Sequence, residues 1–222
     1  QSAAKGDIEA VKRELSKRVD LNAKDSSGNT ALMYASDKNF INVVKLLIQN
    51  GARTNEINYS GNTALSLASF NENGLEVVKI LVQSGANVNI KILPLNRTPL
   101  MFACLKGITE IARFLVQSGA NINAVDTLKV NSLMMALYKG HINTAKMLIE
   151  AGIKIFHINI NGRDALHYAQ YYGHSEIVDI LSKKVLEQDN IINTINIDRQ
   201  QSIGKVFTLA LKYLNVTSRD NK

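Results

Sequence analysis

One cysteine and three histidines are the first side chains to weigh as catalytic groups. Cys104 lies between Ala103 and Leu105 on a stretch that reads as a buried helix, so we favour a packed core thiol over a nucleophile. His141 and His174 each follow a glycine at matching places, and His167 comes just after a predicted helix start. For these three histidines we favour structural hydrogen bonds over acid–base catalysis.

Metal and cofactor motifs are not found. The run His174-Ser-Glu176 imitates a fragment of the zinc deaminase signature, but no pair of cysteines follows it. The sequence has no phosphate-binding loop, no glycine-rich dinucleotide turn after a strand and no H-E-x-x-H motif. We therefore predict no enzyme activity, no catalytic residue, no metal site and no cofactor.

Composition is that of an ordinary globular protein, with 45% hydrophobic and 20% charged residues among 222. No apolar run approaches the roughly 20 residues that a membrane helix needs. The net charge of +7 indicates an anionic partner or a basic surface. The chain starts at Gln1 without a methionine, so the sequence leaves open whether a signal or other upstream segment was removed. The compartment is therefore undecided, with the cytoplasm favoured over secretion or the periplasm.

Two motifs recur with one period, which indicates a repeat protein. In the first motif an apolar residue recurs at spacings of 33, 35, 34 and 32 residues, at Leu32, Leu65, Leu100, Met134 and Leu166. A glycine marks the second motif, at spacings of 34, 34 and 33, in Gly51, Gly85, Gly119 and Gly152.

Each period predicts two helices. Side chains that can accept from the free N–H groups of a helix start predict five N-caps, at Thr30, Thr63, Thr98, Ser132 and Asp164. A small residue follows each cap and allows close helix approach, at Ala35, Ala68, Ala103, Ala136 and Ala169. A second amphipathic helix follows and ends at the glycine of the second motif.

These residues resemble the ankyrin-repeat family, whose pattern is approximately D-x-x-G-x-T-P-L-H-x-A followed by a helix that ends G-A-D-V-N. Thr98-Pro-Leu100 and Gly85-Ala-Asn-Val-Asn89 match it closely, whereas the family histidine occurs only at His167. The resemblance implies an all-α repeat solenoid of stacked helix-turn-helix repeats joined by β-hairpin-like fingers. We expect about six repeats in residues 1–185, the first truncated, and a C-terminal helical cap or tail in 186–222. A partner-binding or membrane-surface helix is the alternative for that tail.

The resemblance also implies a binding surface on the concave face and the finger tips. From Asn89 to Thr98 and from Asn123 to Ser132 the chain has one residue more than from Asn55 to Thr63, so two fingers are predicted to be longer. Apolar residues on them predict an exposed patch, unless these side chains fold back. The predicted partner-binding residues are Tyr59, Phe70, Leu93, Leu95, Arg97, Leu105, Lys106, Leu128, Lys129, Tyr138, Lys139, Arg163, Tyr171 and Tyr172.

The predicted function is a non-enzymatic protein–protein interaction module or scaffold that binds a partner segment across repeats three to six. The listed positions of repeats four to six hold five basic residues and no acidic one, so the expected partner is a protein with acidic and apolar residues. A polyanion or nucleic acid stacked on the tyrosines is the less favoured partner. Another alternative is the targeting domain of a larger effector or enzyme. The chain is expected to act as a monomer.

Overall fold

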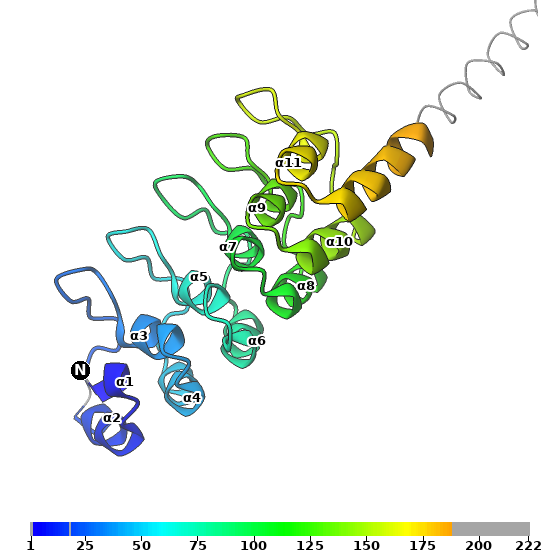
Figure 1. Ribbon diagram of the computed structural model, residues 1–222. Coiled ribbons are helices and arrows are strands. Elements are labelled where there is room, and N and C mark those ends of the chain that lie inside the picture. The colour runs from blue at the N-terminus through cyan, green and yellow to red at the C-terminus, as the bar shows by residue number, and fades with distance from the viewer. Residues whose placement is uncertain (1, 18, 188–222) are drawn as a thin grey trace, which may run out of the picture. The chain divides into compact units, whose positions relative to one another are not determined.

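The computed structural model describes residues 2–17 and 19–187 of the chain. Paired helices follow one another in a stack within a compact unit that ends at Ile177, and a second unit begins at Val178 (Figure 1). A last helical run covers 175–187. The predicted tail, 186–222, lies outside the described residues except for its first two.

Helices of the stack form two rows, and the fingers project from the side of the first row (Figure 1). The first row holds α1 Ser2–Lys5, α3 Ala31–Asp37, α5 Ala64–Ser69, α7 Pro99–Lys106, α9 Ser132–Tyr138 and α11 Ala165–Tyr171. The second row holds α2 Ile8–Leu15, α4 Ile41–Gln49, α6 Leu75–Gln83, α8 Thr109–Gln117 and α10 Ile142–Glu150. The prediction of an all-α repeat solenoid is confirmed.

Five fingers precede the first-row helices of repeats two to six, at residues 22–30, 55–63, 89–98, 123–131 and 156–164. Within the described residues they contain isolated bridges but no continuous strand. At their bases, asparagine side chains join successive repeats: Asn55 Oδ1 accepts from the Asn87 amide at 2.8 Å, and Asn89 Oδ1 accepts from the Asn121 amide at 2.7 Å. In the finger of repeat six, Phe156 occupies this position.

Fully buried leucines and alanines of the first-row helices from α3 onward contribute to the core, together with second-row residues such as Val77, Val78 and Leu81. Leu65, Leu100 and Leu133 are at most 1% exposed. The predicted small residues are at 0% exposure in every one of these helices, at Ala35, Ala68, Ala103, Ala136 and Ala169. Because interiors are close-packed, a larger side chain at these positions would force neighbouring helices apart.

Four of the five predicted N-caps are confirmed. The Thr30 and Thr63 hydroxyls accept from the amides of Met33 and Ser66 at 3.3 and 3.2 Å. Thr98 and Asp164 make the equivalent bonds at 3.4 and 2.9 Å. Each cap therefore satisfies one N–H group that the helix start leaves free.

The prediction of Ser132 as the fifth cap is wrong. Asn131 is the cap of α9, and its Oδ1 accepts from the Met134 amide at 3.0 Å. Ser132 is the first helical residue, and its buried hydroxyl finds no well-formed hydrogen bond to any described residue. Both residue types cap well, so their order alone did not separate them.

This correction removes one of the two predicted long fingers. Measured to Asn131, the finger of repeat five has the same length as that of repeat three. Its left-handed residue is Lys129, with φ 55°, at the place that Gly28 and Gly61 fill in earlier fingers. Val130 follows this residue and precedes the cap, Asn131.

We predict that the capping role separates Asn131 from Ser132 in unfolding experiments. Asn131→Ala removes the cap and is expected to lower the free energy of unfolding by about 1 kcal/mol. Ser132→Ala removes a buried hydroxyl that lies beside the Cys104 thiol, a weak hydrogen-bonding group, and finds no stronger partner among the described residues. The change is therefore expected to stay within about 0.5 kcal/mol or to stabilise the protein. Urea midpoints at unchanged m-value measure both, and a larger loss for Ser132→Ala would contradict the assignment.

Candidate interaction surface

Side-chain turns shape four of the fingers. The Oδ1 atom of Asn58 accepts from the amides of Ser60 and Asn62 at 3.0 and 2.8 Å. The same pair of bonds recurs at three equivalent residues, Asp25, Asp126 and Asn159. These bonds replace water as partners of the turn backbone and fix the conformation of each tip.

The finger of repeat four is built differently, because Ile92 stands where the others have Asp or Asn. Its side chain is 2% exposed, and its backbone exchanges two hydrogen bonds with Arg97 at 2.8 and 3.1 Å. This finger is one residue longer than its neighbours, as the sequence indicates, and Asn96 takes the left-handed position with φ 57°. The long finger therefore buries Ile92 and turns the next residue, Leu93, outward.

Backbone hydrogen bonds tie several neighbouring fingers together. The amides of Tyr59, Thr127 and Ile160 donate to the carbonyls of the preceding finger at 3.1, 2.9 and 3.1 Å. Gly61 lies so close to the finger of repeat four that a Cβ on Gly61 would be 2.7 Å from the Leu93 nitrogen. The finger tips are thus held in a fixed row.

The predicted apolar patch on these tips exists only in part. Leu93 is 61% exposed and Leu128 is 41% exposed, whereas Leu95 and Val130 are partly buried. Two leucines from neighbouring fingers therefore face solvent together with Pro94, whereas Leu95 and Val130 fold back in part.

Arg97 has a structural role that the sequence did not indicate. Its Nε lies 3.4 Å from Oδ2 of Asp126 on the next finger, and the Asp126 side chain is at 0% exposure. Breaking such a pair leaves a buried carboxylate short of one partner. Arg97 thus neutralises the buried carboxylate of Asp126.

The C-terminal ends of the first-row helices carry the other predicted residues. Seven residues after each cap the chain places Asp37, Phe70, Leu105, Tyr138 and Tyr171, and the next residues are Lys38, Asn71, Lys106, Lys139 and Tyr172. These equivalent places change from charged in repeat two to apolar or aromatic in later repeats. They form one row along the stack.

Two aromatic clusters stand on this row. In the first, Phe70 meets Phe102 edge to face at 5.9 Å, and the Lys106 ammonium lies 4.2 Å from the Phe70 ring centre. In the second, Tyr172 meets Tyr138 and Tyr171 edge to face at 5.6 and 4.9 Å. Edge-to-face rings and cations over ring faces are favourable geometries.

Cations of the fifth and sixth repeats border the second cluster. Lys139 lies 5.0 Å from the Tyr138 ring centre, and the Arg163 guanidinium, from the finger, lies 6.0 Å from Tyr171. Fingers and helix row thus meet at this cluster. Tyr59, 75% exposed, lies on the finger of repeat three and belongs to neither cluster.

Two residues of these clusters are not among the predicted binding residues: Phe102, and Tyr168, whose ring centre lies 6.2 Å from that of Tyr172. They lie four residues after their caps, a place held by Leu67 and Met135 in other repeats. The Tyr168 hydroxyl accepts a hydrogen bond from Asn159 Nδ2 at 3.1 Å. In repeat two the equivalent hydroxyl, that of Tyr34, instead donates to the Asp25 carboxylate at 2.6 Å. An aromatic residue four positions after a cap is the sequence signal that could have identified both.

The histidines serve as structural hydrogen-bonding groups. His141 and His174 place Nε2 at 3.1 and 2.7 Å from the carbonyl oxygens of Leu105 and Leu137 in the preceding repeat. His167 Nδ1 lies 2.8 Å from the Asp164 carboxylate of its own helix start. Across residues 2–17 and 19–187 no group of three metal-binding side chains occurs.

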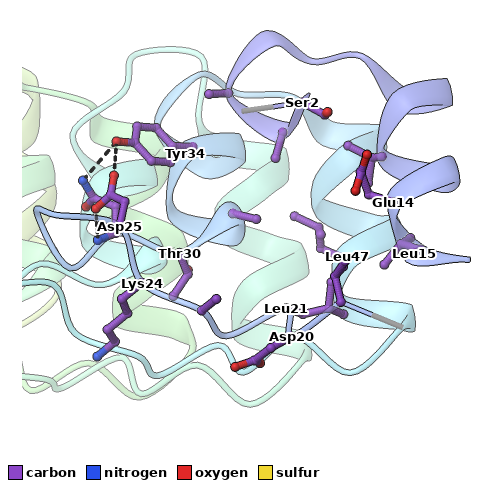
Figure 2. A pocket seen from close by; sticks show the side chains of 17 residues that line it. Ser2, Glu14, Leu15, Asp20, Leu21, Lys24, Asp25, Thr30, Tyr34 and Leu47 are labelled. Atoms are coloured by element: carbon purple, nitrogen blue, oxygen red, sulfur yellow. Dashed lines mark hydrogen bonds between the residues drawn. The ribbon is translucent and has the colours of Figure 1, made fainter. Parts of the chain in front are cut away.

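A cavity of about 370 Å³ opens at the N-terminal end of the stack, between α1, α2 and the finger of repeat two (Figure 2). Figure 2 shows the Tyr34 hydroxyl directed at Asp25 across its rim. The hydroxyl of Tyr34 and the amide of Asn29 hold the pKa of Asp25 below its usual value. No predicted binding residue lines this cavity.

Within the described part of the chain, no helix is long and apolar enough to cross a membrane.

Comparison with known proteins gives one family. The model of ankyrin repeats matches residues 1–92, 93–159 and 125–194. A protein named for its ankyrin repeats in Rickettsia bellii (strain RML369-C) is 39% identical over 71 residues, which cover 29% of this chain and 42% of the relative. The ankyrin repeat protein FPV219 of Fowlpox virus (strain NVSL) is 40% identical over 65 residues, covering 29% of this chain and 15% of the relative. The chain thus matches less than half the length of either relative.

We predict that the thiol of Cys104 does not react in the folded protein. Burial raises its pKa to about 12, so about one thiol in ten thousand is ionised at pH 8. A chromogenic disulfide reagent at pH 8 is expected to label Cys104 only after denaturation in urea. Rapid labelling without urea, at full native circular dichroism, would show an accessible thiolate instead.

We also predict that two arginines of this surface differ in what they stabilise. Arg97→Ala removes the partner of the buried Asp126 carboxylate and is expected to lower the free energy of unfolding by about 1–3 kcal/mol. Arg163 is exposed and forms no ion pair with described residues, so Arg163→Ala is expected to change it by less than about 0.5 kcal/mol. Equal losses in urea unfolding would refute this division.

Proposed function

The chain belongs to the ankyrin-repeat family, and we propose that it is a non-enzymatic module that binds a segment of a partner protein across repeats three to six. Ankyrin repeats generally mediate protein–protein interaction. The observation that carries the proposal is the row of exposed aromatic and basic residues on the first-row helices, beside the row of finger tips.

Aromatic anchors are the expected source of binding energy. Phe70, Tyr138 and Tyr172 are 42%, 50% and 40% exposed while packed against neighbouring rings. Large rings that are already held in place lose little conformational freedom on binding. Residues of this kind carry most of the energy in many interfaces, whereas surrounding contacts mainly exclude water.

Basic residues favour an acidic partner. Lys106, Lys129, Lys139 and Arg163 are exposed on this surface, whereas Asp126 is buried and paired with Arg97. Exposed charges at the rim of an interface mainly steer association and fix register. Arg97 is not counted among these residues, because its guanidinium is paired with the Asp126 carboxylate. We therefore propose a partner segment with alternating acidic and apolar residues, bound by one copy of the chain.

Two other functions remain as alternatives. Exposed Tyr171 beside Arg163 is the observation that favours single-stranded nucleic acid, which stacks on aromatic rings over a basic groove. Binding that weakens steeply with salt would support that alternative. The other alternative is the targeting part of a larger effector or enzyme, which would require a natural chain that contains a catalytic domain besides these repeats.

The proposal predicts that changes on the finger and helix rows abolish capture of the partner. A variant with Leu93→Asp, Tyr138→Ala and Lys139→Glu removes one exposed anchor from each row and reverses one charge. Proteins recovered by the immobilised wild type from a native lysate are expected to fall at least about tenfold with this variant. Quantitative mass spectrometry measures the recovery.

The matched control changes charge on the second-row helices. Lys45→Glu with Arg113→Gln lowers the net charge by the same amount at exposed residues of α4 and α8. This variant is expected to recover the same proteins as the wild type. Equal recovery by the triple variant, with native circular dichroism, would remove the binding site from this surface.

A further inference from the structure

A cavity of about 240 Å³ lies beside the second aromatic cluster. It is lined by Arg163, His167, Tyr168, Tyr171 and Tyr172. Pockets for small molecules usually have about 300–1,000 Å³, so this one is small for a drug-sized ligand. It is of a size to take one large side chain.

The walls of this cavity are held by contacts from outside it. Tyr172 is backed by Tyr138, edge to face, and by His174, stacked at 6.2 Å and 22°. The Tyr168 hydroxyl accepts from Asn159 Nδ2, and Asn159 is itself fixed by the amides of its finger. Two rings are thus positioned before any ligand arrives.

Ring geometry suits an aromatic ligand. Tyr171 stands at 81° to Tyr172, and Tyr168 is tilted by 31° to it. A flat ring that enters beside Tyr172 can therefore meet one wall face to edge and another nearly face to face, both favourable for aromatic pairs. An aliphatic side chain would gain only the burial of its surface.

The positive charge of Arg163, which lines the cavity, favours an acidic residue next to the bound aromatic side chain. Arg163 is exposed and forms no ion pair within residues 2–17 and 19–187. The neighbouring Asp164 carboxylate is partly engaged, because its Oδ1 accepts from the His167 amide and contacts the His167 ring. A carboxylate of the ligand can pair with the Arg163 guanidinium, whereas a cationic ligand would be repelled by it.

We infer that this cavity binds one aromatic side chain of the partner and that Arg163 pairs with a carboxylate adjacent to that side chain. The inference rests on the proposed function and narrows it to a sequence feature, an aromatic residue flanked by acidic ones. Repeat six would then fix the register of the bound segment, because its cavity accepts an aromatic side chain and no other kind.

A tryptophan peptide tests this directly, because the chain contains no tryptophan. The probe is the blocked pentapeptide Asp-Glu-Trp-Glu-Asp, excited at a wavelength that tyrosine does not absorb. Titration with the wild-type protein is expected to shift its emission to the blue and to saturate. Tyr171→Ala and Arg163→Glu are each expected to weaken binding at least about tenfold, whereas Tyr171→Phe changes it less than about twofold.

Controls separate this inference from the proposed function. The peptide Lys-Lys-Trp-Lys-Lys is expected to bind at least about tenfold more weakly, and Lys45→Glu is expected to leave binding of the acidic peptide unchanged. No saturable binding of the acidic peptide, or equal binding of the basic one, would overturn the inference. So would displacement of the peptide by oligothymidylate at low salt. The proposed function would still be judged by the lysate recovery, whose variants leave Arg163 and Tyr171 intact.

Discussion

The close approach of first-row helices at a fully buried alanine is the constraint on which the remaining structure depends. One repeat alone cannot bury its apolar face, so each gains stability from its neighbours. Because the alanines leave room for no larger group, they set the distance between successive helices. At that distance the base asparagines reach the amides of the next repeat, as Asn55 does to Asn87, and the finger backbones come within hydrogen-bonding range. The fixed row of finger tips follows from the core.

Much of this fold could be predicted from the sequence because its determinants are local. A cap acts on the amide three residues later, and a terminal glycine acts on the turn that it occupies. The error at Ser132 shows the limit of one local signal, since Asn131 beside it caps equally well. Ala136 carried the missing information: it follows Asn131 by five residues, the same interval as from Thr30 to Ala35.

The candidate surface was harder to predict because its contacts join different repeats. The composition of the fingers indicated correctly that Leu93 and Leu128 face solvent. The pairing of Arg97 with Asp126 joins residues 29 positions apart, and nothing in either finger alone indicates it. Phe102 and Tyr168 stand at a position that holds Leu67 and Met135 in other repeats, so the sequence does not mark them as surface residues. Their contacts with Phe70 and Tyr172 appear only in the structure.

Stability and recognition are divided between different places of the same repeat. Leucine and alanine recur in the core with little change, whereas the place seven residues after the cap changes from Asp37 to Phe70 and Tyr171. From repeat three on, that place lies at the surface, so a substitution there removes ring contacts such as Phe70 with Phe102 but leaves the buried leucine and alanine packing in place. In a stack whose stability is a sum of nearest-neighbour terms, such places are able to vary independently. The aromatic residues at this place in repeats three, five and six are therefore what the proposed binding surface uses, because the buried leucines and alanines already account for the stacking.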